Sequence, residues 1–358
     1  MRRRNFLAMA AALAAPRDRA ARLHRESIII NCHDHMRRAR DFEDMRTGGV
    51  TAKIYKPLAD GIYWDDSNRR VFPPDPFDWT GKYLELISGV ERLEGKVLIA
   101  RTVADIERAK ETGQVAAIFG NEGSLPLGGD LRRLENLYTR GLRELAPFWP
   151  AGNHTSHILE PDGGLTQFAR KLIAAANEMG IVLDSSHLAG GPAFGQMVQE
   201  SRKPLIHTHG APRYPRTRKL LEGDLEDDQI RAVSGSGGVI GLHFCTYIKN
   251  PNGWNWQPTL DDLLDHVEHL RRVGGIACIG IGADHFPYNR RPVRKPFDRV
   301  GNNEIEDRDW SRTFVEGLEN ISAMPRFTEG LVQRGFSDDE IVSILGGNVL
   351  RVLKEVWK

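Results

Sequence analysis

The stretch SIIINCHDH at residues 27–35 sets the pattern from which the fold is predicted. Its apolar half has the length and the β-branched composition of a buried strand, and it runs directly into His33, Asp34 and His35. Side chains alternate along an extended chain, so His33 and His35 should project to the same side. Two imidazoles at this spacing suit one metal ion. The stretch therefore predicts a buried strand that ends in candidate metal ligands.

Similar apolar runs recur along the chain, and most are followed by apolar residues at helical spacing. We count eight such runs, at Ser27–Cys32, Val50–Tyr55, Val115–Phe119, Leu142–Phe148, Ile181–Asp184, Pro204–His207, Val239–Phe244 and Ala277–Ile281. The predicted helices are Trp79–Leu93, Val103–Lys110, Leu131–Thr139, Thr166–Met179, Phe194–Ser201, Leu225–Val233 and Leu260–Val273. This alternation indicates an α/β fold with a parallel sheet, and eight repeats indicate closure into a single-domain (β/α)8 TIM-type barrel. A doubly wound open sheet is the alternative.

The connection after the second predicted strand differs from the others. Residues 56–77 are rich in Pro, Asp and aromatic residues, and the segment is too long for a tight connection. We expect this insert to lie over one mouth of the barrel.

Several helix ends carry their own signals. Asp105 lies in the first turn of one helix and Gly113 follows its last turn, while Gly180 stands where a left-handed cap would precede a strand. Ser337 followed by Glu340 predicts a capping box. The helix that it opens is predicted to stop at residues 346–347, which are both glycine.

Composition narrows the possible partners. Lys and Arg number 49 against 48 Asp and Glu, and this balance gives no electrostatic reason to expect nucleic acid or an anionic membrane surface. The expected partner is a small molecule. Three cysteines, Cys32, Cys245 and Cys278, allow at most one disulfide. No apolar run reaches the about 20 residues of a transmembrane helix.

The N-terminus has the features of an export signal. Arg3 and Arg4 precede Asn5-Phe6-Leu7 and a short apolar run with small residues, a pattern that resembles a twin-arginine signal. We therefore assign residues 1–14 to the signal and 15–358 to the barrel domain. A periplasmic or secreted protein is expected, or a cytoplasmic one if the signal does not function.

Side chains that can bind metals gather directly after the predicted strands. They are His33 and His35 after the first strand, Glu122 after the third, His187 after the fifth, His209 after the sixth and Asp284 after the eighth. In a parallel barrel the carboxyl ends of the strands meet at one face, and that face holds the active site. Each histidine alone could be an ordinary loop residue, but their joint placement favours a metal centre.

The number of candidate ligands indicates two ions rather than one, because catalytic zinc usually takes three protein ligands. The hypothesis places His33 and His35 on one ion, His187 and His209 on the other, and Glu122 on both. Two cations about 3.5 to 4 Å apart lower the pKa of a shared water toward neutrality and polarise a carbonyl. Asp284 would then take the water's proton and pass it to the leaving nitrogen. We expect two Zn²⁺, with other divalent metals as alternatives.

These residues resemble the membrane (renal) dipeptidase family of the amidohydrolase superfamily. The likeness runs from His33 to the C-terminal Gly347-Asn348-Val349, with Asn121-Glu122-Gly123 and Gly280-Ile281-Gly282-Ala283-Asp284 among its specific pieces. The resemblance implies a binuclear zinc barrel, dipeptide hydrolysis and a homodimer. It makes Glu122 the bridge, His187 and His209 ligands of one zinc, and Asp284 the catalytic carboxylate.

The chain departs from the family pattern at three places. His33-Asp34-His35 stands where the family has His-x-Asp, a change that imidazole as a zinc ligand tolerates. Around Trp149 a substrate-contacting histidine is missing, with His154 or His157 as replacements, and Tyr247 lies near the place of a substrate-binding tyrosine.

The family also holds the free carboxylate of its substrate with an arginine. Arg218 is the best match for that residue, since a guanidinium fork suits a carboxylate, but a solvated basic loop explains it equally well.

Three functions follow from these patterns. The first is an exported metallodipeptidase that cleaves a peptide bond between small residues. The second is a related amidohydrolase with a reshaped pocket, an N-acyl amino acid deacylase or a lactonase, which Trp149 favours. The third is an inactive binding homologue, against which the complete set of Glu122, His187, His209 and Asp284 argues.

Overall fold

Eight parallel strands surround a common centre in the computed structural model, which describes residues 16–67, 70–74, 76–93, 95–150, 157–189, 191–213, 224–245, 257–285 and 312–358. They are β1 (Ile30–Asp34), β2 (Ala52–Tyr55), β7 (Val115–Phe119), β8 (Glu144–Leu145), β9 (Val182–Leu183), β10 (Ile206–Pro212), β12 (Val239–Leu242) and β13 (Ile279–Ile281).

Parallel pairing joins these strands into a ring. The main sheet runs from β10 through β12, β13, β1 and β2 to β7, and β8 pairs with β9. Single parallel bridges between Phe119 and Leu142 and between Asp184 and Ile206 connect these two parts. The predicted barrel is therefore confirmed, and all eight predicted runs contribute a strand to it.

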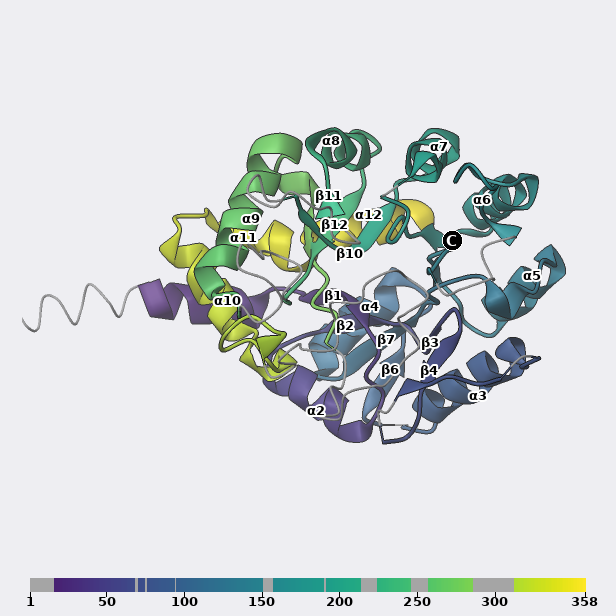
Figure 1. Cartoon of the computed structure of the whole chain (residues 1–358). Helices are drawn as coiled ribbons and strands as arrows, with labels where there is room; N and C mark the ends of the chain where they lie inside the picture. The colour runs from purple at the N-terminus through teal and green to yellow at the C-terminus, as the bar shows by residue number, and fades with distance from the viewer. Residues whose placement is uncertain are drawn as a thin grey trace, which may run out of the picture.

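Helices surround the strands, as the view along the barrel shows (Figure 1). Those predicted from the sequence are α3 (Trp79–Glu91), α4 (Val103–Thr112), α5 (Leu131–Thr139), α6 (Gln167–Met179), α7 (Pro192–Glu200), α8 (Asp227–Gly235) and α9 (Leu260–Gly274). The structure adds a helix at residues 16–26, α2 (Ala39–Thr47) and α10 (Pro325–Gln333), none of which was predicted. In α2 the only apolar residues buried are Phe42 and Met45, too few to form a recognisable helical stripe.

The predicted caps are present. Thr102 and Asp105 form a capping box at the start of α4, and Gly113 ends that helix in the left-handed region at φ 70°. Gly180 ends α6 in the same way at φ 79°. Ser337 accepts a hydrogen bond from the backbone of Glu340 at the start of α11 (Asp338–Val342). Local polar chemistry thus sets these helix ends.

The predicted stop at residues 346–347 is confirmed. The segment that α11 opens passes through a π-helical turn at residues 343–347 and breaks at Gly346, whose φ of 179° and ψ of −16° are not helical, before a second helix, α12 (Asn348–Val356), begins. A Cβ on Gly346 would lie 2.3 Å from the backbone oxygen of Ile28. This glycine therefore permits close packing against the chain entering β1 at the break between the two helices.

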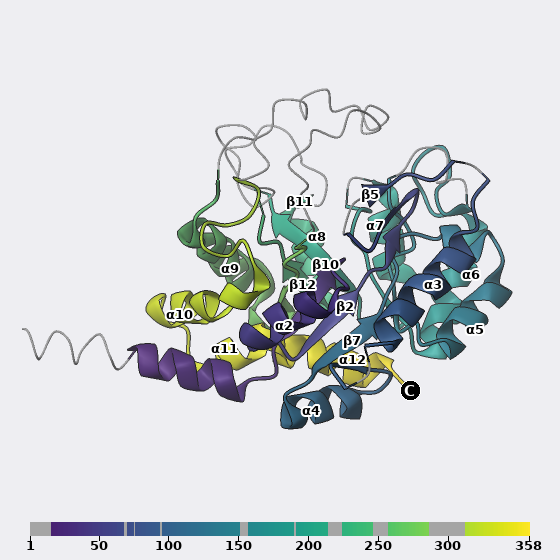
Figure 2. The ribbon, with the colours of Figure 1, turned by 90° about the horizontal axis from the view of Figure 1, so that it is seen from below.

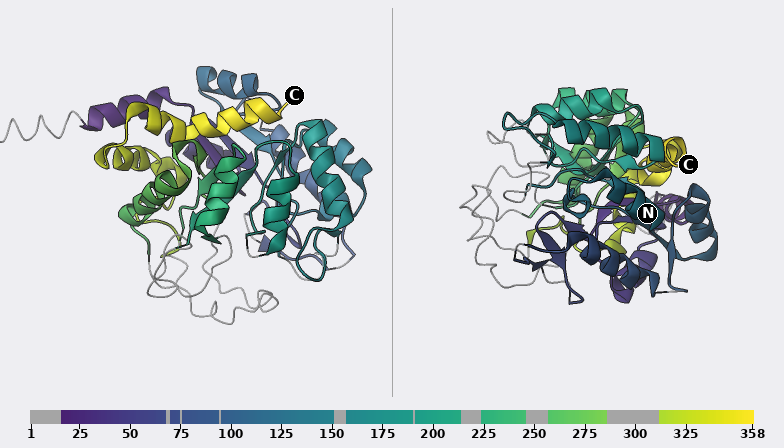
Figure 3. Two further views of the ribbon diagram at one scale, coloured as in Figure 1. Left: turned by 90° about the horizontal axis from the view of Figure 1, so that it is seen from above. Right: turned by 90° about the vertical axis from the view of Figure 1, so that its right-hand side faces the viewer.

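The last helix closes the amino-terminal mouth of the barrel. Val349, Val352, Leu353 and Val356 of α12 belong to the same buried cluster as inward residues of the strands, which include Ile30, Cys32, Ala52, Ile54, Ala116, Ile118, Val182, Ile206 and Val239. Figure 3 shows this yellow helix running across one end of the molecule. Chemistry is thereby confined to the opposite, carboxyl end.

The insert after β2 folds into a small antiparallel sheet. Its strands are β3 (Leu58–Ala59), β4 (Ile62–Trp64) and β5 (Arg70–Val71). A bridge between Ala59 and Glu122 joins it to the loop after β7. Figure 2 shows β5 at the end of the molecule opposite α4 and α12. The insert therefore lies over the carboxyl mouth, as predicted.

Two further strands branch from the ring. β6 (Val97–Ile99) pairs with the first half of β7, and β11 (Asp224–Leu225) pairs with the end of β10. All three cysteines are buried and none forms a disulfide. Among the described helices, none combines the length and the apolar character needed to cross a membrane.

Candidate metal centre

An extra residue in β1 aims His33 and His35 into the barrel. Three residue steps on β1, from Asn31 to Asp34, face two steps on β2, so the strand carries a bulge. Without it, strict alternation from the inward residues of β1 would turn Asp34 to the centre. The bulge turns the two imidazoles inward instead, and Asp34 binds the ammonium of Lys53 at 2.9 Å.

β10 carries the same kind of bulge. Three steps from His207 to Gly210 face two on β12, and His209 lies within this irregular stretch. Bulges are frequent at barrel rims beside active sites because they redirect side chains. The structure thus brings His209 to the same buried region as His33 and His35.

Glu122 lies on the loop after β7, and the insert supports that loop. The Asp60 carboxylate accepts hydrogen bonds from the backbone N–H groups of Ser124 and Leu125, each at 2.9 Å. Gly123 has φ 119°, and a Cβ there would lie 2.0 Å from the carboxyl carbon of Asp60. Only glycine fits this turn, which fixes the direction of the Glu122 side chain.

His187 and Asp284 have strained backbones. They are the non-glycine residues with positive φ in the described part of the chain, at 67° and 49°. Such conformations are uncommon outside glycine, and they concentrate at functional sites. Both residues were assigned to the site from the sequence.

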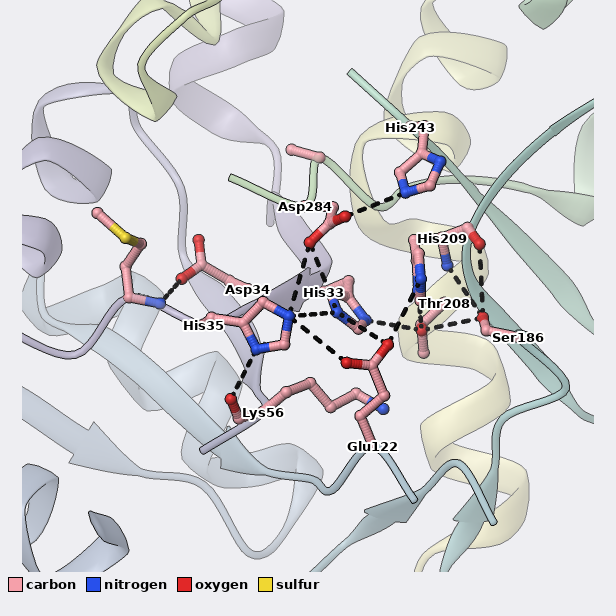
Figure 4. Close-up of polar contacts among 12 residues, drawn as sticks. His33, Asp34, His35, Lys56, Glu122, Ser186, Thr208, His209, His243 and Asp284 are labelled. Atoms are coloured by element: carbon pink, nitrogen blue, oxygen red, sulfur yellow. Dashed lines mark hydrogen bonds and ion pairs between the residues drawn. The ribbon is translucent and has the colours of Figure 1, made fainter. Parts of the chain in front are cut away.

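The imidazoles of the four predicted histidine ligands meet around the Glu122 carboxylate, and Figure 4 shows those of His33, His35 and His209. Glu122 Oε1 lies 2.7 Å from His187 Nε2, 3.5 Å from His209 Nε2 and 3.6 Å from His33 Nε2. Glu122 Oε2 lies 3.5 Å from His35 Nε2. The Nε2 atoms of His33 and His35 are 3.2 Å apart. One carboxylate therefore faces four imidazoles, three through Oε1 and one through Oε2.

Asp284 approaches the same centre from the loop after β13. Its Oδ1 atom lies 3.6 Å from His33 Nε2 and 3.7 Å from His35 Nε2, and its Oδ2 atom lies 3.3 Å from His243 Nε2. Burial raises the pKa of Asp284 to about 7. Three overlapping groups have ligand atoms within 4.8 Å of one another: His33, His35 and Asp284; His33, Glu122 and His209; His209, His243 and Asp284.

The hydroxyl of Thr208 identifies which imidazole nitrogens carry hydrogen. It donates to Asp184 Oδ2 at 2.5 Å and lies 3.0 Å from His33 Nδ1 and 3.1 Å from His209 Nδ1. Burial acts to raise the pKa of Asp184, but Lys56, His207 and the hydrogen bonds from Thr208 outweigh it and lower that pKa to about 2. Because the single hydroxyl hydrogen points to this carboxylate, both imidazoles must donate from Nδ1.

The tautomer of His35 is also fixed by an acceptor, in this case a backbone oxygen. Its Nδ1 atom lies 2.9 Å from the backbone oxygen of Lys56, which can only accept. Burial lowers the pKa of His35 to about 4 and the pKa values of His33 and His209 well below the usual range, so the rings are neutral. Three bare Nε2 lone pairs then converge on buried carboxylates. This donor set fits a divalent cation.

A buried ion network lies beneath these ligands. The Lys56 ammonium contacts Glu144 Oε1 at 2.6 Å and Asp184 Oδ2 at 3.1 Å, and all three side chains are fully buried. Burial acts to lower the pKa of Lys56, but the carboxylates of Glu144 and Asp184 outweigh it and raise that pKa. The network links Lys56 through Asp184 and Thr208 to the ligand imidazoles.

Aromatic side chains cover two of the imidazoles. Trp64 of β4 stacks on His35, with ring centroids 3.8 Å apart, and Trp149 meets His187 edge-on at 6.3 Å. Trp149 also packs against the small apolar cluster of Ala59, Ile62 and Trp64. The structure therefore places Trp149, predicted to contact substrate, beside the metal centre.

The structure does not describe three of the predicted substrate contacts. His154, Arg218 and Tyr247 lie outside the described residues. His157, the alternative to His154, is exposed and packs against Phe168.

Sequence reasoning missed His243 and the Lys56 network. His243 follows the apolar run of β12 directly, the same signal that pointed to the proposed ligands, so it could have been found. Burial lowers its pKa to about 3. Lys56, Glu144 and Asp184 carry no comparable signal, because a lysine or a carboxylate beside a strand usually faces solvent.

A parallel barrel with buried imidazoles and carboxylates at the carboxyl ends of its strands has the architecture of a metal-dependent hydrolase. The chain belongs to the membrane dipeptidase family, peptidase family M19, whose family model matches residues 9–292 and 306–358. It is thus a hydrolase of a dipeptidase-type metallopeptidase family.

One curated protein and two solved structures are also similar to this chain. The chain is 26% identical over 341 residues to Dipeptidase 3 of Rattus norvegicus, covering 91% of this chain and 60% of that protein. An amidohydrolase from Pseudomonas aeruginosa has a TM-score of 0.77 at 23% identity, covering 94% of this chain and 99% of the other. A metallopeptidase from Rhodobacter sphaeroides, solved with a phosphinate mimic of the dipeptide L-Ala-D-Ala, has a TM-score of 0.70 at 20% identity and coverages of 93% and 100%.

Proposed function

We propose that this protein is a binuclear metallodipeptidase. The observation that carries the proposal is the position of Glu122, whose two oxygens lie within 3.6 Å of four imidazole Nε2 atoms from β1, β10 and the loop after β9. A carboxylate with two oxygens can bind two cations, and each cation would keep two imidazoles.

Each side chain then has a defined task. His33 and His35 would hold one cation, His187 and His209 the other, and Glu122 both. Zinc suits a site of imidazoles and carboxylates, and other divalent metals remain compatible with it. When bound, the pair supplies Lewis-acid activation of water and of the substrate carbonyl.

Asp284 is the proposed proton carrier. Its Oδ1 atom faces the Nε2 atoms of His33 and His35 at 3.6 and 3.7 Å, so it is directed toward the place where the cations would lie. It would accept the proton of the attacking water and deliver it to the nitrogen of the departing amine.

The substrate class is proposed from family membership and from relatives. The name of the rat protein and the ligand of the Rhodobacter structure both point to dipeptides, in the second case to one with a D-residue at the C-terminal position. Arg218 would bind the substrate's carboxylate, and His154 and Tyr247 would contact its backbone.

A second candidate is an N-acyl amino acid deacylase, with a lactonase as its variant. The apolar cluster of Trp64, Ala59, Ile62 and Trp149 beside the metal centre favours it, because these side chains suit an acyl chain better than a charged amino group.

A substrate panel decides between the two candidates. Zinc-loaded protein is assayed with L,L-dipeptides, with L,D-dipeptides and with N-acyl amino acids of increasing chain length. The proposal expects the higher kcat/KM for dipeptides. A preference for long N-acyl groups would contradict it and support the deacylase, and the absence of any turnover would favour an inactive binding homologue.

Replacing Asp284 by Asn tests the proton carrier. The variant keeps the shape of the side chain but loses its basicity, so kcat should fall by about 10²- to 10⁴-fold. Metal content measured on the same sample should stay near that of the wild type. Unchanged kcat would show that another group moves the proton.

We further propose that residues 1–14 direct export to the periplasm and that the protein is a homodimer. Changing Arg3 and Arg4 to Lys should retain the protein in the cytoplasm, and sedimentation should give a dimer mass. Export that is insensitive to this change, or a monomer mass, would contradict the respective expectation.

A further inference from the structure

His243 lies between the two strands that supply His209 and Asp284. It follows β12 directly, and its backbone N–H donates to the oxygen of Gly210 on β10 at 3.0 Å. The side chain is 3% exposed, and its ring centroid lies 4.8 Å from that of His209. Its place in the barrel therefore fixes the imidazole at the edge of the metal centre.

The two oxygens of Asp284 face different partners. Oδ1 faces His33 and His35, whereas Oδ2 lies 3.3 Å from His243 Nε2. Asp284 stands just after β13 at φ 49°, and its backbone N–H donates to the oxygen of His33 at 3.2 Å. The backbone is thereby tied to β1, and the His243 contact visible in Figure 4 holds the carboxylate at the end of the side chain.

Two roles are compatible with this position. His243 could bind a cation, because His209, His243 and Asp284 form a group with ligand atoms within 4.8 Å. It could instead hold Asp284. Each of the four histidines proposed as ligands lies within 3.6 Å of Glu122, whereas the carboxylate that His243 contacts is Asp284. The second role fits this difference better.

We propose that His243 is a positioning residue that donates from Nε2 to Asp284 Oδ2 and thereby keeps Oδ1 turned toward the cation pair. The inference rests on the proposed function and extends it to a residue outside the ligand set. As the base of the proposed reaction Asp284 is ionised, and an ionised carboxylate only accepts hydrogen bonds, so the imidazole is the donor. Partners of this kind commonly change activity by about 10- to 100-fold when removed.

Three variants test the proposal. His243→Leu removes the donor, and His243→Gln returns an N–H at a similar distance from the backbone. His24→Leu is the matched control: it removes another buried imidazole, which contacts Thr328 and the backbone of Gly48 in the amino-terminal part of the chain. For each zinc-loaded variant, metal content, kcat and KM for the best dipeptide, and a crystal structure are obtained.

The expected result is a kcat about 10- to 100-fold lower in the His243→Leu protein with unchanged metal content, and recovery of most of that loss by His243→Gln. The control should lose thermal stability but keep its kcat. A fall in metal content on His243→Leu would identify a ligand and overturn the proposal, as would an unchanged kcat.

The crystal structures keep this inference separate from the proposed function, because they need no substrate. Rotation of the Asp284 carboxylate in the His243→Leu protein, but not in the His243→Gln protein, supports the positioning role even if dipeptides are not cleaved. An Asp284 carboxylate that keeps its orientation without His243 overturns it.

Discussion

At the scale of single residues, Thr208 sets the tautomers of two proposed ligand imidazoles. Its hydroxyl contacts Asp184 and the Nδ1 atoms of His33 and His209, and it thereby leaves both Nε2 atoms as bare acceptors. The Lys56 ammonium holds Asp184 from the other side. The nitrogen that each proposed ligand imidazole offers is thus set by a buried hydrogen-bond chain and not by the imidazole alone.

Replacing Thr208 by Val should weaken metal binding. The change removes the acceptor shared by two ligand imidazoles and leaves Asp184 without one of its donors, so the metal dissociation constant should rise by about 10- to 100-fold. Competition with a chromophoric chelator measures this directly. Thr208→Ser retains the hydroxyl and should stay close to the wild type. Equal dissociation constants for the Val and Ser variants would contradict this role.

At the scale of elements, the helix that packs into the barrel core and the residues of the candidate metal centre lie at opposite mouths of the barrel. The helix α12 packs its apolar face into the amino-terminal mouth, whereas the bulged ends of β1 and β10 and the insert sheet build the opposite mouth. Changes in α12 should therefore alter the free energy of unfolding without altering the site.

Leu353→Ala tests this separation. Leu353 is fully buried, so its truncation should lower the free energy of unfolding by about 2 to 5 kcal/mol, measured with denaturant at fixed zinc concentration. The kcat of the folded variant should not change. Val342→Ala, at a residue 41% exposed, is the control and should cost less than about 0.5 kcal/mol. A large fall in kcat for Leu353→Ala would show that the two mouths are coupled.

Comparison of these elements with the sequence shows what periodicity can predict. Apolar runs and caps such as Gly113 and Gly180 identified the eight barrel strands and seven helices, because these signals are local. The helix α2 was missed, since its formation depends on tertiary packing. Of the site, the proposed ligands after the strands do lie together, and His243 was overlooked.

The bulges explain why part of the site could not be predicted in detail. Alternation correctly placed His33 and His35 on one side of β1, but it could not tell which side, because the extra residue is visible only in the pairing with β2. The ion network of Lys56, Glu144 and Asp184 likewise could not be predicted, because it is recognised only from the distances between these side chains.

At the scale of the whole molecule, the buried carboxylates Glu122 and Asp284 make the metal-free state less favourable. Charges buried without a partner destabilise a fold, and cations bound at this centre would neutralise them. Any ion that binds the folded chain alone also stabilises it by mass action. The free energy of unfolding should therefore rise as the metal centre is filled.

Metal removal tests this linkage. At a free zinc concentration one hundred times the dissociation constant, binding at one site adds about 2.7 kcal/mol to the free energy of unfolding. The melting temperature should fall on exhaustive chelation and return on adding zinc, whereas magnesium at the same concentration should restore less. The same melting temperature with and without chelator would contradict a resident metal centre.

The most direct test of a carboxylate shared by two cations is the metal content of purified protein, measured by elemental analysis for the wild type and for Glu122→Ala. The account predicts close to two zinc ions per wild-type chain and a loss of at least one ion from the variant. A wild-type protein that is fully active with one ion or none, or a variant that keeps both, would contradict it.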